Sequence, residues 1–150
     1  VFYLDKTGEH GLVAAIEDLP GTYQWGCYKE HVDGNLEDSE IGTGYQNTKD
    51  IVSQGCATEN GGISAAQAAL DYESEGYSDW YLPSDNELLE MYISIGPGAS
   101  QGNIGGFMYQ YYLSSTGYDY YSATGINFDD GEWGILFRNS AIQVRVIRAF

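Results

Sequence analysis

The segment Gly76–Tyr92 constrains the fold more than any other part of the chain, because it joins a short aromatic strand to a clearly marked helix. Pro83 ends the strand, since proline donates no backbone hydrogen bond. Ser84 follows it and Glu87 lies three residues further on, which is the spacing of a capping box at a helix N-terminus. Apolar residues then recur at helical spacing, at Leu88, Met91, Tyr92 and Ile95. The sequence therefore predicts a helix whose apolar face packs against another layer of the protein.

Shorter signals on either side of this segment predict an α+β domain. A hairpin is expected at the start, where Val1–Leu4 and Gly11–Ile16 flank a glycine-containing turn. Helices are predicted over Thr48–Gln54, with Asn47 as the N-cap, and over the alanine-rich Ser64–Ser74. The remaining predicted strands are Tyr23–Trp25, Tyr111–Ser115, Thr124–Phe128, Glu132–Phe137 and Ile142–Phe150. Helices early and strands late indicate an α+β fold rather than alternating βαβ units.

The length and the charge of the chain limit what it binds. A chain of 150 residues buries roughly 68–70% of its unfolded surface, which suffices for a core, so residues 1–150 are interpreted as a single domain. Twenty-two acidic residues against six basic ones give a formal net charge of −16. The field of such a charge repels phosphate and anionic lipid, which excludes nucleic acid as a partner. The charge either keeps a secreted protein in solution or attracts a cationic partner, and the sequence leaves both interpretations open.

The cysteines and the first residues indicate an extracellular or cell-surface location. We expect Cys27 and Cys56 to form one disulfide, which contributes ~3.5 kcal/mol by the chain-entropy estimate. Two buried free thiols are the alternative. No apolar run is long enough to cross a bilayer, so direct membrane insertion is not expected. Because the chain opens inside the strand-like stretch Val1–Leu4, we expect the natural protein to extend upstream with a signal or a stalk.

Several separated motifs occur in an order that resembles a known family. They are GEHGLVAAIEDL, WGC, IGTGYQNTKDIV and GC near the front, then GYSDWYLPS, YYLSS, NFDDG and the terminal VRVIRAF. The chain resembles the DUF1566 family, named for the C-terminal domain of a Legionella collagen-like adhesin, with related patterns in bacterial lipoproteins and in variable proteins of diversity-generating retroelements. The resemblance implies a C-type-lectin-like fold, with two or three helices packed on a small, mostly antiparallel twisted sheet. It also implies a binding function at a bacterial or phage surface.

The predicted binding surface lies between Leu113 and Arg138. In the family, a tryptophan usually stands where this chain has Leu113, and an aromatic residue is common where it has Thr124. These departures lie beside a run of tyrosines on a glycine-punctuated segment, and tyrosine offers a large rigid contact area with a hydroxyl group. The predicted ligand-binding residues are Leu113, Tyr118, Asp119, Tyr120, Tyr121, Ser122, Thr124, Asn127, Glu132, Trp133, Ile135, Phe137 and Arg138.

A binding surface of this kind requires some aromatic side chains to lie outside the core. Those expected to be mostly exposed are Tyr118, Tyr120, Tyr121 and Trp133, and those expected to be mostly buried are Tyr111, Phe128 and Phe150. The alternative is that many of these rings fill the core of a small sheet, where aromatic residues are common. The resemblance to retroelement variable proteins also implies that this C-terminal region is diversified, which the nucleotide sequence would test.

Two acidic segments are candidate calcium sites, because hard cations prefer carboxylate and amide oxygens. One is the tight turn that contains Asn127, Asp129, Asp130 and Glu132. The other contains Asp33, Asn35, Glu37 and Asp38, but it lacks the glycine and the glutamate that an EF-hand loop needs at its sixth and twelfth positions. Solvated acidic loops are the alternative in both places. No cofactor is required, and calcium is the ion that the sequence suggests.

Two of the six basic residues lie near the C-terminus, at Arg145 and Arg148. We expect them to pair with carboxylates such as Asp79 or Asp85, because a buried cation needs a partner. Such pairs would fix the last strand to the rest of the domain.

Little in the sequence points to catalysis. His10 and His31 are the only histidines, and neither has a helical partner for zinc or a nucleophile beside it. No phosphate-binding glycine loop, dinucleotide fingerprint or Gly-x-Ser-x-Gly elbow occurs. A pair of carboxylates for glycoside hydrolysis stays open as an alternative.

We therefore expect an extracellular ligand-binding or adhesion domain, and not an enzyme, that presents a C-terminal Tyr/Trp-rich surface to a protein or carbohydrate ligand. The main alternative is a structural surface-lipoprotein or stalk-tip domain without a dedicated ligand. Such a domain would associate with copies of itself, and a homotrimer fits a domain at the tip of a collagen-like stalk.

Overall fold

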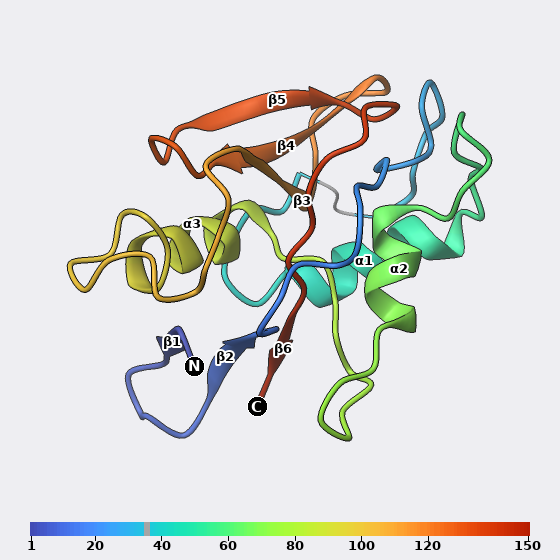
Figure 1. The fold of residues 1–150 in the computed structure, drawn as a ribbon. Helices are drawn as coiled ribbons and strands as arrows, with labels where there is room; N and C mark the ends of the chain where they lie inside the picture. The colour runs from blue at the N-terminus through green and yellow to red at the C-terminus, as the bar shows by residue number, and fades with distance from the viewer. Residues whose placement is uncertain (35–36) are drawn as a thin grey trace.

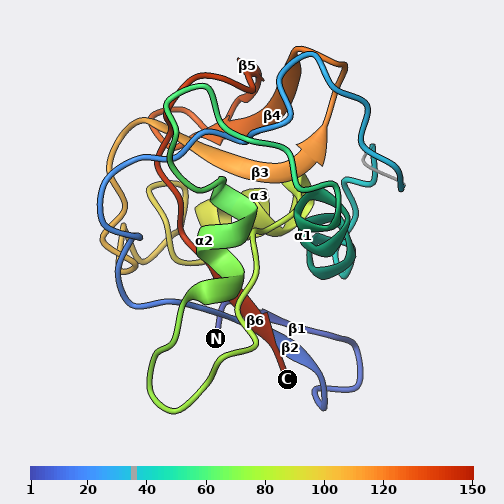
Figure 2. The same cartoon turned by 90° about the vertical axis from the view of Figure 1, so that its right-hand side faces the viewer.

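The computed structural model describes residues 1–34 and 37–150, and within them the chain forms three helices and six strands. The helices are α1 (Gly44–Ser53), α2 (Ala65–Asp71) and α3 (Asp85–Ser94). The strands are β1 (Tyr3–Leu4), β2 (Gly11–Ala14), β3 (Tyr111–Gly117), β4 (Ser122–Asn127), β5 (Trp133–Phe137) and β6 (Ile147–Ala149). They form two antiparallel sheets, ordered β1-β2-β6 and β3-β4-β5, with the helices between them (Figure 1 and Figure 2). The α+β class is therefore confirmed.

Helix α3 begins as the sequence predicts. The Ser84 N–H donates to Glu87 Oε2 at 2.8 Å, and Ser84 Oγ accepts from the Glu87 N–H at 3.4 Å, so the capping box is confirmed. Glu87 Oε1 also accepts the Gly42 N–H at 2.8 Å. Burial raises the pKa of the Glu87 carboxyl. Leu88 and Met91 of the apolar face are fully buried, which fixes the helix against the sheet layers.

Helix α1 begins at Gly44, whereas the predicted start was Thr48. Asn47 is not its N-cap, because it lies inside the helix and is buried, where its amide donates to the Asp38 carbonyl at 2.8 Å. Close packing explains why a glycine, Gly44, stands at the start of α1. A side chain at Gly44 would collide with the Glu87 carboxylate at the start of α3.

Helix α2 is shorter than predicted. Ser64 caps its N-terminus, but the helix ends at Asp71 and does not reach Ser74. Glu75 and Gly76 both have positive φ, at 53° and 84°, and the residues on either side of them pair. A tight turn of this kind needs extended backbone on both sides, so the helix stops before it. Within the described ranges, no helix is both long and apolar enough to cross a bilayer.

The β1-β2-β6 sheet brings the two ends of the chain together, as Figure 1 shows. β1 and β2 form the predicted hairpin, whereas β6 is shorter than the predicted strand Ile142–Phe150. Residues 142–146 instead cross from the other sheet to this one. They bond to the early part of the chain through pairings such as Tyr23 with Ile142. Of the predicted strand Tyr23–Trp25, only this single bridge at Tyr23 forms.

The β3-β4-β5 sheet contains the three strands predicted before the last segment, with ends shifted by a few residues. The strands follow one another in the chain and pair antiparallel. The turn between β4 and β5 contains Gly131 with a φ of 80°, as the Asp-Asp-Gly sequence predicts. This sheet carries most of the predicted ligand-binding residues.

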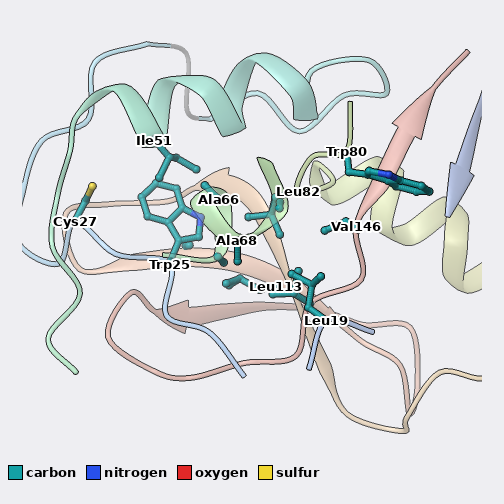
Figure 3. Close-up of a cluster of buried hydrophobic side chains, with 14 of the residues drawn as sticks. Leu19, Trp25, Cys27, Ile51, Ala66, Ala68, Trp80, Leu82, Leu113 and Val146 are labelled. Carbon is teal, nitrogen blue, oxygen red and sulfur yellow. The ribbon is translucent and has the colours of Figure 1, made fainter. Parts of the chain in front are cut away.

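Trp25 belongs to the larger core cluster (Figure 3). It is fully buried, and its Nε1–H donates to the Ser114 carbonyl at 3.1 Å. Its ring faces Ile51 of α1 in Figure 3. Nearby, Cys27 is bonded to Cys56. The predicted disulfide is therefore confirmed, and it joins the early part of the chain to the segment just after α1.

The two arginines near the C-terminus have different partners. Arg148 donates from Nε to Asp79 at 2.8 Å, as predicted. Arg145 donates from Nε to Asp18 at 2.6 Å, so its predicted pairing with a carboxylate is confirmed, but the partner is neither Asp79 nor Asp85. Asp18 is the partner because the early part of the chain runs beside residues 142–146, whereas the Asp85 carboxylate is bound by other side chains.

Candidate binding surface

Strand β5 presents three apolar side chains in a row to solvent. It lies at the edge of its sheet, and successive side chains of a strand point to opposite faces. Trp133, Ile135 and Phe137 are 48%, 49% and 61% exposed, while Leu136 between them packs against the core. Single exposed apolar residues are ordinary, but a row on one strand forms a patch that favours an interaction.

The hairpin between β3 and β4 extends this row. The Tyr118 ring meets the Trp133 ring edge to face, with centroids 5.9 Å apart, and the Arg138 N–H donates to the Tyr121 carbonyl at 2.8 Å just after β5. We define the aromatic surface as the six exposed side chains Tyr118, Tyr120, Tyr121, Trp133, Ile135 and Phe137. The predicted exposure of its three tyrosines and its tryptophan is confirmed.

Hydrogen bonds hold the hairpin tip in one conformation. Asp119 Oδ1 accepts the Tyr121 N–H at 2.8 Å, and the Lys29 N–H donates to the Tyr120 carbonyl at 2.7 Å. The ring of Tyr121 also meets that of Tyr28 edge to face. A surface already held in place loses little conformational freedom when it binds.

Four of the predicted ligand-binding residues lie beneath this surface. They are buried, and they are Leu113, Ser122, Thr124 and Arg138. Leu113 packs beside Trp25 in the core cluster, because β3 is covered on both faces. Leu113 and Ser122 therefore support the surface from below, whereas Thr124 and Arg138 each line a pocket at its edge.

Arg138 joins the hairpin to the segment before α1. Its Nε donates to the Ser122 carbonyl at 3.3 Å, and its Nη1 donates to the Cys27 and Glu30 carbonyls at 3.1 Å each. The guanidinium also stacks over the Trp25 ring at 4.2 Å from the centroid. Burial lowers the pKa of Arg138 to about 10, so the side chain is charged at neutral pH.

Three aromatic side chains were expected inside the core, and they differ in how deeply they are buried. Phe128 is fully buried, as predicted, whereas Tyr111 is only partly buried. Phe150 is 44% exposed, so its predicted burial is wrong. It follows the edge strand β6 and lies over Gly11, which covers one side of its ring.

The turn between β4 and β5 contains the residues predicted to bind calcium. Asn127 Oδ1 accepts the Asp129 N–H at 3.0 Å, and Asp130 Oδ1 accepts the Glu132 N–H at 2.9 Å. These bonds shape the turn, and no group of three or more acidic, histidine or cysteine side chains converges within residues 1–34 and 37–150. Calcium stays a prediction here, and added calcium must raise the Tm if it binds the native state. The other predicted segment includes Asn35, which lies outside the described residues.

A pocket of about 320 Å³ opens beside Trp133, and its most unusual residue is Asp85. Asp85 Oδ2 accepts from the Thr124 hydroxyl at 2.7 Å and from Trp133 Nε1–H at 2.9 Å. Burial raises the pKa of this carboxyl. The sequence suggested Asp85 only as an ion-pair partner for Arg145 or Arg148, and not as a pocket residue. A second pocket of about 340 Å³ shares Tyr118 with this one and is also lined by Arg138.

A scan against models of protein families finds no match for this chain, and a search of curated proteins finds none either. The resemblance to the DUF1566 family therefore rests on the sequence motifs.

Proposed function

We propose that this protein is an extracellular binding domain that presents the aromatic surface to a protein or glycan ligand. The observation that carries the proposal is the exposed row of Trp133, Ile135 and Phe137, which Tyr118 joins to the tyrosines of the hairpin tip. Aromatic side chains are enriched in binding interfaces and lose little side-chain entropy on contact. The hydrogen-bonded hairpin tip supports the proposal further, because an ordered surface binds at a lower entropic cost.

The proposal includes a C-type-lectin-like fold and membership of the DUF1566 family. The three helices, the small antiparallel sheets and the motif order support it. The disulfide supports an extracellular location, since disulfides persist in oxidising environments. Diversification of the aromatic surface by a retroelement is the next step of the proposal. The absence of a near-copy template repeat and a reverse transcriptase beside the gene would exclude that step.

The experiment compares ligand capture by three forms of the labelled domain. The wild type, the Trp133→Ala/Phe137→Ala variant and the control variant Ile16→Ala/Ile104→Ala are applied to a glycan array and to proteins extracted from cell surfaces. The control removes two exposed apolar side chains outside the aromatic surface. We expect the first variant to lose at least about tenfold in affinity, since buried aromatic anchors contribute about 2 kcal/mol or more each. Equal capture by all three forms would contradict the proposal.

Self-association is a second candidate function, and the position of β5 favours it. The strand is an edge strand, and such an edge can pair with an extended segment of another chain. Its exposed apolar side chains would be covered in a homo-oligomer. Light scattering after size exclusion tests this, because a self-associating domain is a dimer or trimer at micromolar concentration and the Phe137→Ala variant is a monomer.

A carboxylate-based hydrolase is the remaining candidate, and the pocket beside Trp133 favours it. Asp85, with its raised pKa, and Glu37 both line that pocket, and glycosidases use a carboxylic acid with a second carboxylate. Release of sugars from array-positive glycans, detected by mass spectrometry and lost in Glu37→Gln, would support this function over simple binding.

A further inference from the structure

The pocket beside Trp133 lies at one end of the aromatic surface. The exposed rings of Tyr118 and Trp133 line it, together with the buried residues Asp85, Thr116 and Thr124. Its volume of about 320 Å³ has room for one small organic group. The few side chains that line the pocket therefore determine which ligand it can bind.

Asp85 lines this pocket, and one of its two carboxyl oxygens is unpaired. Its side chain is only 6% exposed. Oδ2 accepts two hydrogen bonds, from Thr124 and Trp133, whereas Oδ1 is buried and has no hydrogen-bond partner in the part of the chain that the structure describes. A buried oxygen without a partner carries a free-energy cost and is rare in native proteins. A ligand that donates a hydrogen bond to Oδ1 removes that cost.

Local and long-range charges favour a cationic donor. Asp85 is the first residue of α3, where the helix dipole stabilises negative charge. Glu37 lines the same pocket, and the net charge of −16 attracts cations to the whole protein. Burial acts in the opposite direction and raises the pKa of Asp85. A cation at Oδ1 would lower that pKa again, because a nearby positive charge favours the ionised carboxylate.

The arrangement selects an ammonium group over a guanidinium group. A guanidinium binds a carboxylate through two parallel N–H bonds, one to each oxygen. Asp85 Oδ2 already accepts two hydrogen bonds, which leaves one free oxygen. An ammonium group is a compact point charge that needs a single oxygen. The rings of Tyr118 and Trp133 attract a cation through their faces and pack against its apolar carbons.

We propose that this pocket binds a protonated primary amine, which donates a hydrogen bond to Asp85 Oδ1 and whose carbons pack against the exposed rings of Tyr118 and Trp133. The inference rests on the proposed function, because it names the group that anchors a ligand at the aromatic surface. A lysine side chain of a protein and an amino sugar of a glycan both carry this group.

The test follows the indole N–H signal of Trp133 by NMR while small probes are added. The amine probes are Nα-acetyl-lysine methylamide and glucosamine, and the matched neutral probes are their N-acetylated forms. We expect the amines alone to shift the Trp133 signal. The indoles of Trp25 and Trp80 serve as internal controls, because they donate to backbone carbonyls elsewhere. The amine with the higher affinity indicates whether the natural ligand is a protein or a glycan.

Three variants test the role of the carboxylate. Asp85→Asn keeps the shape of the side chain but removes its charge, and we expect amine affinity to fall at least about tenfold. Asp71→Asn makes the same charge change at the exposed end of α2 and should leave the affinity unchanged. Tyr118→Ala removes an exposed ring and should weaken binding about threefold; it decides the question if Asp85→Asn does not fold. Equal shifts with the acetylated probes, or wild-type affinity in both pocket variants, would overturn the proposal.

The outcomes also separate this inference from the proposed function. If amines do not shift the Trp133 signal but Trp133→Ala/Phe137→Ala loses ligand capture, the domain binds through the aromatic surface without an amine anchor. If amines bind while that double variant captures ligands normally, the pocket binds amines but the aromatic surface is not the binding face.

Discussion

Replacement of Arg138 by alanine should destabilise the domain far more than replacement of Arg148. Arg138 is 3% exposed and donates three hydrogen bonds to backbone carbonyls of two separate segments. Hydrogen bonds to charged groups contribute about 1.5–3 kcal/mol each, and the desolvation of the buried guanidinium offsets part of their sum. We therefore expect Arg138→Ala to lower the free energy of unfolding by about 3 kcal/mol.

Arg148 provides the matched control. It forms an ion pair with the half-exposed Asp79 and lies over the Tyr77 ring, and contacts of this kind contribute about 1 kcal/mol. Arg138→Lys should recover less than half of the loss, because one ammonium cannot reproduce the planar fork of a guanidinium.

Urea denaturation of the four proteins, followed by tryptophan fluorescence, measures these differences as shifts in midpoint at constant slope. Arg138→Ala should also weaken ligand capture, because the hairpin that carries Tyr120 and Tyr121 loses the side-chain hydrogen bond to the Ser122 carbonyl at its base. If Arg138→Ala and Arg148→Ala lose the same stability, or if Arg138→Lys matches the wild type, the reasoning about the buried guanidinium is refuted.

Three further predictions concern the parts of the fold that support the surface. Cys27→Ser/Cys56→Ser should lower the free energy of unfolding by ~3.5 kcal/mol; denaturation with and without reductant checks this, and an unchanged midpoint in the reduced wild type would contradict it. Gly44→Ala should cost about 1–3 kcal/mol, because its methyl group meets the Glu87 carboxylate, whereas Gly62→Ala, which meets only the Asn60 side chain, should be nearly neutral by the same assay. Burial raises the pKa of the Asp85 carboxyl in the folded state above its unfolded value of 3.8. The folded wild type therefore holds the carboxyl proton more tightly than the unfolded chain, and its free energy of unfolding falls as the pH rises from 3.8 to the folded-state pKa. The stability of Asp85→Asn relative to wild type should therefore increase with pH from about pH 4 upward. A stability difference that stays constant with pH would contradict a raised pKa for Asp85.

Local sequence patterns predicted the structure correctly where it depends on residues that lie close together in the chain. The capping box of Ser84 and Glu87 was predicted because both partners lie within one helical turn. The exposure of Trp133 was predicted from the cluster of aromatic residues around it on a glycine-punctuated segment. The disulfide followed from the presence of two cysteines in a chain of extracellular character.

Contacts between distant segments were the ones that sequence reasoning missed. Helix α1 starts at Gly44 because that position packs against Glu87, far along the chain. Arg145 pairs with Asp18 because residues 142–146 run beside the early part of the chain, a crossing that no local pattern indicates. Asp85 was missed as a pocket residue for the same reason, since its partners come from strands that follow much later.

The aromatic surface is the central claim, and hydroxyl-radical footprinting of the domain with a captured ligand tests it most directly. The readout is the oxidation of individual exposed aromatic residues, with and without the ligand. The account predicts protection of Tyr118, Tyr120, Tyr121 and Trp133 on binding, and unchanged oxidation of Tyr77 and Tyr109, which are exposed outside the surface. Protection of Tyr77 or Tyr109 with unchanged oxidation of Trp133 and the hairpin tyrosines would contradict it.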